Sequence, residues 1–371
     1  MNTVEKSLVI CFQMWNIMTK TGIVYTPKCL SHNPGSTHPE SPKRLKVMME
    51  ALNSSHIIDG ERCRLFEPEP ARVEDVELIH HPDYIRLVAR VCSSGGGLLD
   101  LGDTEVSPES FEVALYAVGG GLKAVDLVLA GKVENAFAFV RPPGHHAGPY
   151  TASGFCIFNN IAITAMYLLC KIKLDRILIL DVDAHHGNGT QEVFYDTDKV
   201  LYISLHQDPR GFPGTGFIDE IGEKDGLGYK VNFPFPFRTC DKMYERAFEQ
   251  VITPMVEQYK PQFILVSAGF DGHFSDTVAE LSLTVDGYMR TFLTIVNYAS
   301  RLCQGRLAAL LEGGYNLDVV GKIATGVVSG MAGIPASFPA EYPKIDRRAV
   351  KQAEKVIQEV KRIHSAYWKL S

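Results

Sequence analysis

The sequence predicts an α/β protein with a parallel sheet, and two observations support that fold class. Short apolar runs alternate with longer segments of helical spacing, as in βαβ units. The runs also lack polar alternation, which is typical of strands buried on both faces. The expected strands span residues 22–25, 136–140, 177–180, 200–205, 263–267 and 307–311.

Between these strands, apolar residues recur at helical spacing. Helices are expected over residues 111–130, 160–169 and 243–259. After a loop over residues 337–343, an amphipathic helix over residues 346–368 is expected to pack on the body of the protein. No repeat, low-complexity segment or shift in composition marks a domain boundary, so residues 21–371 are expected to form a single domain.

Composition narrows the class of protein. The 371 residues are 46% hydrophobic and carry a net charge of −6, which argues against a nucleic-acid partner, because such domains are usually basic. The eight cysteines have no C-x-x-C spacing, so we expect reduced thiols in a cytoplasmic or nuclear protein. The apolar stretch Ser7–Met18 is too short to span a membrane and has no signal-peptide cleavage site after it, so residues 1–20 are interpreted as an extension.

Four of the expected strands are each followed by a segment that carries polar side chains. In a parallel sheet the carboxyl ends of these strands share one edge. The segments that follow them are Arg141-Pro-Pro-Gly-His145-His146, Asp181-Val-Asp183-Ala-His185-His186, Ala268-Gly-Phe-Asp271 and Glu312-Gly-Gly-Tyr315. Buried carboxylates and imidazoles are costly unless something compensates them, and a divalent metal ion does so. These residues are therefore expected to meet in one metal site.

Asp183, His185 and Asp271 are the candidate metal ligands. Asp183 and His185 lie two residues apart and point to the same side of an extended chain. Two carboxylates and one imidazole suit a divalent cation with positions left open for water and substrate. A two-metal site of the arginase kind would require acids where Gly187 and His273 stand, so one metal is favoured over two.

The remaining candidates would act on protons and on developing charge. His145 and His146 follow a stiff Pro-Pro-Gly turn, and a neutral imidazole can take a proton and later donate it. Asp181 and Asn188 are the nearest groups that could orient these rings. Tyr315 could donate to an oxyanion, although a core tyrosine remains open on spacing alone. His80 and His81 have no such context and are interpreted as structural or surface residues.

Together these motifs resemble the zinc-dependent histone deacetylase family of the arginase–deacetylase superfamily. Besides the four strand ends, the resemblance rests on three further motifs in family order: His38-Pro-Glu-Ser-Pro-Lys-Arg44, Gly154-Phe-Cys-Ile-Phe-Asn-Asn160 and Gly211-Phe-Pro-Gly-Thr-Gly216. The resemblance implies a single domain on an eight-stranded parallel sheet and hydrolysis of acetyl-lysine in a protein or peptide. Acetylpolyamines or other small amides are the alternative substrates, and a non-catalytic acetyl-lysine binder is the alternative class.

The resemblance also implies the role of each residue. It makes Asp183, His185 and Asp271 the ligands of one zinc or ferrous ion, His146 the general base and acid, His145 its electrostatic partner paired with Asp181, and Tyr315 the oxyanion donor. Asn188 would orient His146. Substrate contacts would come from Gly154, Phe155, Phe212, Val278 and Asp103, with Asp100 as an alternative to Asp103. Potassium would bind an inner set (Asp181, Asp183, His185, Ser204, Leu205) and an outer set (Phe194, Thr197, Val200, Tyr229). The oligomeric state stays open.

Overall fold

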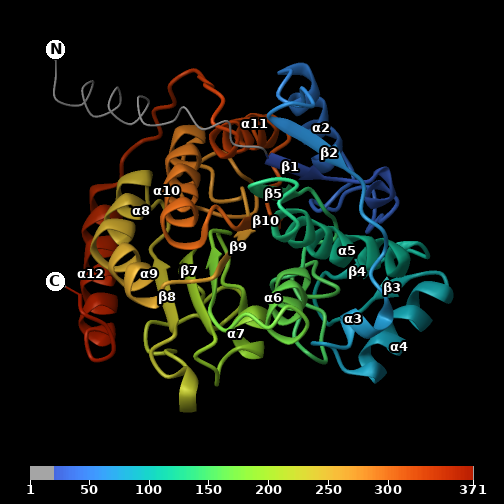
Figure 1. Cartoon of the computed structure of the whole chain (residues 1–371), viewed down its shortest axis with the longest axis horizontal. Helices are drawn as coiled ribbons and strands as arrows, with labels where there is room; N and C mark the ends of the chain where they lie inside the picture. Colours follow the sequence, from blue (N-terminus) through green and yellow to red (C-terminus); the bar gives the residue numbers. More distant parts are fainter. Residues whose placement is uncertain (1–20, 371) are drawn as a thin grey trace.

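The computed structural model describes residues 21–370, and in them eight parallel strands form one sheet with helices on both faces (Figure 1). The strand order is β2-β1-β5-β10-β9-β6-β7-β8. The strands are β1 (Thr21–Val24), β2 (Cys63–Phe66), β5 (Asn135–Ala138), β6 (Ile177–Asp181), β7 (Val200–Gln207), β8 (Lys230–Phe235), β9 (Phe263–Ala268) and β10 (Leu307–Leu311). A separate hairpin joins β3 (Gly97–Leu98) to β4 (Glu105–Val106). The predicted fold class is confirmed.

All six strands expected from the sequence are present, but the prediction missed β2 and β8. Both are edge strands of the sheet. In β2, Arg64 and Leu65 are exposed, so the segment lacks the continuous apolar run used to find strands. β8 contains Asn232 and Pro234, and proline argues against a central strand but is tolerated at an edge.

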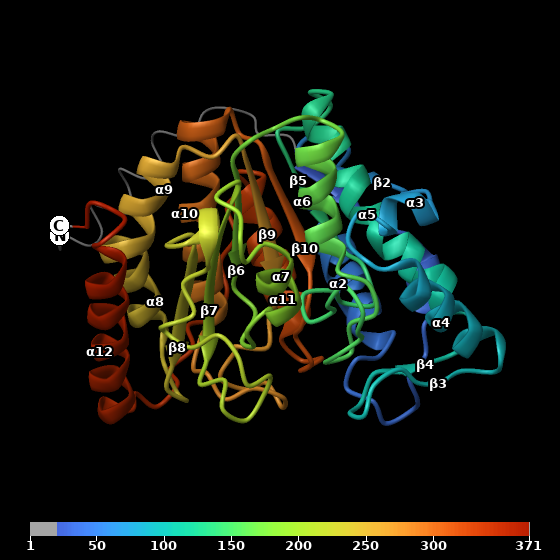
Figure 2. The ribbon, with the colours of Figure 1, turned by 90° about the horizontal axis from the view of Figure 1, so that it is seen from below.

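Burial on both faces explains the apolar runs. Along β6, Ile177 and Ile179 pack in the cluster that includes α5 and α6, whereas Leu178 and Leu180 pack in the cluster on the opposite face. Figure 2 shows α6 and α10 on opposite sides of the strands. The α-helices are α2 (Lys43–Ser54), α3 (Val73–Val76), α4 (Pro82–Ser93), α5 (Ser110–Leu129), α6 (Asn160–Cys170), α7 (Asn188–Val193), α8 (Asp241–Ala247), α9 (Thr253–Tyr259), α10 (Val285–Cys303), α11 (Val320–Met331) and α12 (Arg347–His364).

Two helix predictions need correction. The segment expected as one helix over 243–259 consists of α8, a π-helical turn (Phe248–Ile252) and α9. The C-terminal helix expected over 346–368 is α12, which begins after Asp346, because that carboxylate accepts the N–H groups of Arg348 and Ala349. It ends at His364, four residues before the predicted end, and buries the predicted apolar face through residues such as Ile357.

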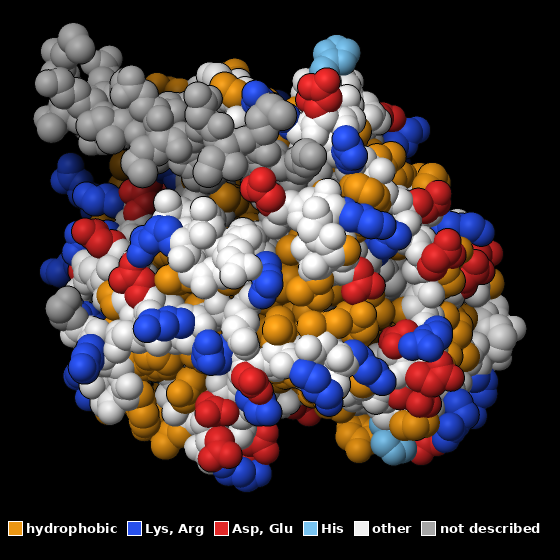
Figure 3. Space-filling view, in the orientation of Figure 1, with side chains coloured by type: hydrophobic (Ala, Val, Ile, Leu, Met, Phe, Trp, Pro, Cys, Tyr) orange, Lys and Arg blue, Asp and Glu red, His pale blue; other side chains and the backbone are white. Residues whose placement is uncertain are grey.

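The surface carries both signs of charge. On the face seen in Figure 3, basic and acidic side chains are interspersed, with apolar atoms gathered between them. Within residues 21–370, no helix has the length and apolarity needed to cross a bilayer. The predicted extension over residues 1–20 lies outside the described residues.

Candidate active site

The four strands whose ends carry the polar motifs are neighbours in the sheet, in the order β5-β10-β9-β6. Asp181, the last residue of β6, pairs with Ser267 of β9 on one side and Ser204 of β7 on the other. Because all of these strands are parallel, the segments that follow them leave the sheet at the same edge. The predicted convergence is therefore present in the fold.

Asp183, His185 and Asp271 form a buried group in which one potential ligand atom from each lies within 4.8 Å of the others. His185 Nδ1 is 2.9 Å from Asp271 Oδ2 and 3.3 Å from Asp183 Oδ1. Burial alone would lower the pKa of His185, but the two carboxylates raise it to about 10. Their field thus strongly favours positive charge at this point.

Backbone N–H groups fix the orientation of both carboxylates. Gly313 N donates to Asp183 Oδ2 at 2.8 Å, and Ala184 N donates to Asp271 Oδ1 at 3.0 Å. The other oxygen of Asp271, Oδ2, is buried and has no hydrogen-bond donor, because His185 Nδ1 approaches it without the alignment that a hydrogen bond requires. A buried oxygen without a donor is costly, and a divalent cation would satisfy it. The three residues therefore fit a metal ion.

The paired histidines sit on a loop that Glu312 holds against the sheet. The Glu312 carboxylate accepts the backbone N–H groups of Gly144 at 2.7 Å and His145 at 3.2 Å. Burial raises the pKa of Glu312 to about 7. The sequence indicates that Glu312 stands at a strand end but not its role, because nothing in its spacing shows which backbone amides donate to it.

The two imidazoles have different partners. His145 Nδ1 donates to Asp181 Oδ2 at 3.0 Å, whereas His146 Nδ1 donates to the Asn188 amide oxygen at 2.8 Å. The ring centroids of the two histidines are 4.0 Å apart. Asp181 is held further by the Tyr202 hydroxyl at 3.0 Å. Both partners are those expected from the sequence. Each hydrogen bond uses the Nδ1 atom of its histidine and does not involve Nε2.

The two imidazoles also differ in pKa, because the charged groups around them differ. Burial lowers the pKa of His145, but Asp181 and Asp183 more than compensate and raise it to about 10. For His146, burial and then the neighbouring His145 and His185 hold the pKa well below its usual value. The pair therefore combines an imidazole that favours the charged form with one that favours the neutral form, and only a neutral imidazole can accept a proton.

Tyr315 lies on a loop fixed from two sides. Asp276 Oδ2 accepts the backbone N–H groups of Tyr315 at 2.7 Å and Asn316 at 3.0 Å. From the other side, Arg44 donates to the carbonyl oxygens of Gly314 at 2.6 Å and Glu312 at 2.5 Å, and its guanidinium carbon lies 4.7 Å from the centre of the Tyr315 ring. The position of this side chain is thus set by its backbone and by a cation–π contact.

Arg44 belongs to one of the family motifs, but this positioning role was not predicted from the sequence. A signal was available, because Arg44 is four residues before Met48 on the buried stripe of α2. Arg44 is fully buried and also pairs with Glu40 at 2.9 Å. A charged residue on an apolar stripe indicates a buried partner.

The three residues predicted to form the tunnel walls lie beside these groups. The Phe212 ring centroid is 4.9 Å from that of His146 and 6.0 Å from that of His185, and the Phe155 ring is 5.8 Å from Tyr315. Gly154 has φ +53°, and a Cβ there would lie 2.5 Å from the His146 ring. Only glycine leaves room for that ring, so the structure brings all three wall residues to the site.

Asp100 and Asp103, the two candidate acids for the mouth of the predicted tunnel, have different hydrogen-bond partners. The Asp100 carboxylate accepts the N–H groups of Gly102 and Thr104 and the Thr104 hydroxyl, so it stabilises its own loop. Asp103 is exposed, and its carbonyl oxygen lies 3.1 Å from His38 Nε2, next to the tunnel wall. These contacts favour Asp103 over Asp100 as the acid available to a substrate.

The inner potassium residues are brought together by the pairing of β6 with β7, which sets Asp181 beside Ser204. Among the described side chains, no lysine or arginine donates to a carbonyl of the inner set, and the Tyr244 hydroxyl donates to Leu205 O at 2.9 Å. Three carbonyl groups of the outer set have a side-chain donor. Its Thr197, Val200 and Tyr229 carbonyl oxygens accept hydrogen bonds from Lys230 Nζ.

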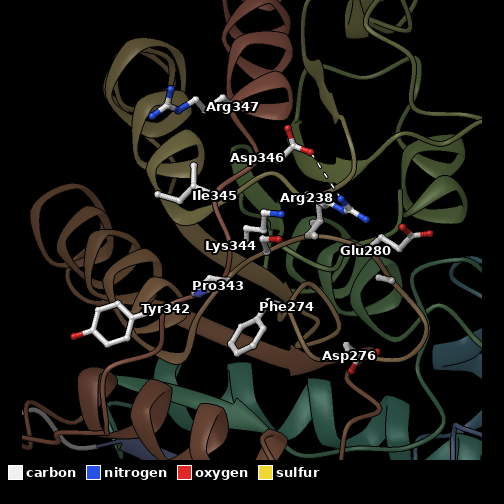
Figure 4. A pocket seen from close by; sticks show the side chains of 13 residues that line it. Arg238, Phe274, Asp276, Glu280, Tyr342, Pro343, Lys344, Ile345, Asp346 and Arg347 are labelled. Carbon is white, nitrogen blue, oxygen red and sulfur yellow. Dashed lines mark ion pairs between the residues drawn. The ribbon is translucent and has the colours of Figure 1, made fainter.

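A pocket of about 940 Å³ is lined by Asp276, the residue whose carboxylate holds the Tyr315 backbone (Figure 4). It is bordered by Asp276, by the exposed Phe274 and by an ion pair between Arg238 and Asp346 at 3.9 Å. The group of three predicted metal ligands does not line it. The pocket is therefore separate from the candidate metal site. Asp276 connects the two, because it lines the pocket and also accepts the backbone N–H of Tyr315.

Comparison with known proteins gives a consistent result. Residues 38–331 match the histone deacetylase domain. The chain is 44% identical over 359 residues to a probable deacetylase of Archaeoglobus fulgidus, covering 94% of this chain and 99% of that protein. It is 34% identical over 313 residues to a histone deacetylase-like amidohydrolase of Pseudomonas aeruginosa, covering 84% and 80%. The crystal structure of the HDA15 HD domain superposes with a TM-score of 0.85 at 31% identity, covering 95% of this chain and 96% of that one.

Proposed function

Because this chain belongs to the histone deacetylase family, we propose that it is a metal-dependent deacetylase acting on N6-acetyl-lysine in proteins, which it hydrolyses to lysine and acetate. The observation that carries this proposal is the buried group of Asp183, His185 and Asp271 beside two imidazoles with different partners. A protein that only binds acetyl-lysine would have no need of such proton-transferring groups.

One metal ion per chain is proposed, held by Asp183, His185 and Asp271. Two carboxylates and an imidazole suit zinc, and ferrous iron is the alternative. When bound, such a cation supplies a Lewis acid that polarises the acetyl carbonyl and makes water more acidic. Potassium is proposed for the inner set at the ends of β6 and β7, where buried carbonyl groups meet the carboxylates of Asp181 and Asp183.

His146 is the proposed general base and acid. Its Nδ1 is committed to Asn188, so Nε2 takes the proton from the attacking water and later delivers it to the leaving amine. The lowered pKa keeps the ring neutral and ready to accept. Asn188 orients the ring without adding charge.

Negative charge that develops on the acetyl oxygen needs compensation. Tyr315 is the proposed donor, because burial raises its pKa well above the ordinary value and keeps its hydroxyl protonated. His145, in turn, retains its proton through Asp181 and supplies positive charge 4.0 Å from the His146 ring. Each histidine thus has a separate task.

The proposed substrate follows from the tunnel and its mouth. Phe155 and Phe212 offer apolar surface to the four methylenes of a lysine side chain. The alternative substrate is an acetylpolyamine, whose second ammonium would require an acid at or beside the position of Val278. Val278 is apolar, and both Asp276 oxygens already accept backbone N–H groups, including that of Val278. These features favour acetyl-lysine.

A substrate panel tests this proposal. Rates on an acetyl-lysine peptide and on acetylspermidine should differ clearly in favour of the peptide. Val278→Glu, which adds the missing charge, should move the ratio towards acetylspermidine, and an exposed ion pair predicts a change of about two- to five-fold. Preference for acetylspermidine in the parent protein would replace the proposed substrate, and no hydrolysis of either with metal bound would refute the proposed function.

The extent and location of the activity are also proposals. Residues 21–371 are proposed as the catalytic domain, which contains the whole region that matches the family. The cytoplasm, or the nucleus in a eukaryote, is the proposed compartment, supported by cysteines that are free throughout the described residues.

A further inference from the structure

Lys230, the first residue of β8, is a buried cation without a carboxylate partner. Its side chain is fully buried, and among the described residues it forms no ion pair. Asp198 and Asp196 attract it only from a greater distance. Lysine is almost never fully buried unless its charge is compensated, so the surroundings of the ammonium must supply another kind of partner.

That partner is a set of three backbone carbonyl oxygens. Lys230 Nζ donates to Val200 O at 2.9 Å, to Thr197 O at 3.0 Å and to Tyr229 O at 3.3 Å. Three acceptors require three N–H donors, and only the protonated amine has three. Burial lowers the Lys230 pKa to about 7, but the hydrogen-bond count favours the charged form.

The remaining carbonyl groups of this region are also satisfied. Between Thr197 and Val200, the carbonyl oxygen of Lys199 accepts the N–H of Ile177 at 2.9 Å, and the one proton of the Tyr259 hydroxyl is shared between the carbonyl oxygens of Asp198 at 3.2 Å and Lys199 at 2.7 Å. The carbonyl of Phe194, the fourth member of the outer set, accepts the N–H of Thr197 at 3.3 Å. The chain itself therefore supplies donors to these carbonyl groups of the turn before β7.

Rings of backbone carbonyls are the ligands that replace the hydration shell of potassium in proteins. An ion bound to the Thr197, Val200 and Tyr229 oxygens would have to share its position with an ammonium of the same charge. The residues of the outer set therefore do not fit a potassium ion while Lys230 stays in place.

We propose that the Lys230 ammonium takes the place of the outer potassium ion, so that this chain fills its outer cation site with its own side chain. Alkali cations are then left to the inner set, which contains no such ammonium. The outer region consequently stays ordered whatever the potassium concentration, and only the inner region responds to it.

Thallium, a heavy substitute for potassium that crystallography detects directly, tests this proposal. Crystals of the parent protein in thallium acetate should contain no ion at the Thr197, Val200 and Tyr229 carbonyls. In Lys230→Ala, which removes the ammonium and leaves space, an ion should appear there. Thallium at these carbonyls in the parent would overturn the proposal. So would its absence from folded Lys230→Ala, because the carbonyls would then not form a cation site.

Thermal unfolding gives an independent readout. Lys230→Ala should unfold about 5 °C or more below the parent in choline chloride, since it leaves buried carbonyls without donors, and should regain part of that loss in potassium chloride of equal ionic strength. Lys230→Met fills the space without charge. Its unfolding temperature should lie below that of the parent by the same amount in both salts. Lys224→Met, at an exposed ion pair with Asp196, serves as the control and should match the parent.

A larger potassium response in the parent than in Lys230→Ala would contradict the proposal. Should Lys230→Ala fail to fold, thallium occupancy in the parent decides alone. These readouts do not use deacetylation, so they stay informative whatever the substrate proves to be.

Discussion

The floor and the mouth of the site are built differently. The floor (Asp183, His185, Asp271, His145, His146) is buried, and its carboxylates and imidazoles are oriented by backbone amides or by neighbouring side chains. The mouth (Asp103, Phe212, Val278) is partly or fully exposed. A rigid floor suits bond-breaking, which needs fixed geometry, whereas an exposed mouth can vary without disturbing the fold. Changes in the floor should therefore alter turnover, and changes at the mouth should alter substrate binding.

The largest effect is expected from the loss of a proposed metal ligand. Asp271→Ala should lower kcat about 10⁴-fold, because a Lewis acid contributes several kcal/mol to the reaction. Elemental analysis of the purified variant should find less than stoichiometric metal. Parent-level turnover together with a full metal content would show that Asp271 does not bind the metal.

Tyr315→Phe should cost less, about 10²–10³-fold in kcat, because it removes one oxyanion donor and leaves the ligands intact. Metal content and thermal stability should remain those of the parent. Tyr342→Phe, at an exposed position, is the matched control and should not change the rate. An unchanged kcat in Tyr315→Phe would show that the hydroxyl has no part in the reaction.

Asn188→Asp should move the pH profile more than the maximum rate. In the parent protein the His146 pKa lies below its usual value, so the neutral base persists as pH falls. A carboxylate beside Nδ1 would stabilise the imidazolium and raise that pKa, by about 1 unit or more. The acidic limb of kcat/KM should therefore shift to higher pH. A limb that stays in place would mean that another group controls it.

At the mouth, Asp103→Ala should raise KM for an acetylated peptide about tenfold with little change in kcat, because one hydrogen bond to a charged group is lost. A small acetyl-lysine derivative without a peptide backbone should show no change and serves as the internal control. A drop in kcat for both substrates would show that Asp103 affects the buried catalytic groups and not the binding of the peptide.

Most of the floor could be predicted because its residues follow apolar runs. The run that ends at Asp181 indicates a buried parallel strand, and the spacing of Asp183 and His185 indicates a shared side. Asp271 and His146 could be added only by assuming that four strands lie side by side, which the sheet order bears out.

What escaped prediction depends on contacts between distant segments. β8 was missed because Lys230, Asn232 and Pro234 interrupt its apolar pattern, and only its place at the sheet edge makes it a strand. Glu312 and Arg44 were left without roles, because their partners are backbone groups on other segments. Backbone partners leave no side-chain pattern to find.

The sequence by itself determined the fold class, and it indicated the candidate metal ligands and the paired histidines, because both follow from apolar runs and local spacing along the chain. Only the tertiary structure decided which groups interact. Asp181 accepts a hydrogen bond from His145 and Asn188 accepts one from His146. Arg44 lies over the Tyr315 ring, and Lys230 donates to the carbonyl groups expected to bind an ion. The physical reason is that hydrogen bonds and charge interactions depend on distances across the folded chain, and separation along the sequence does not set those distances.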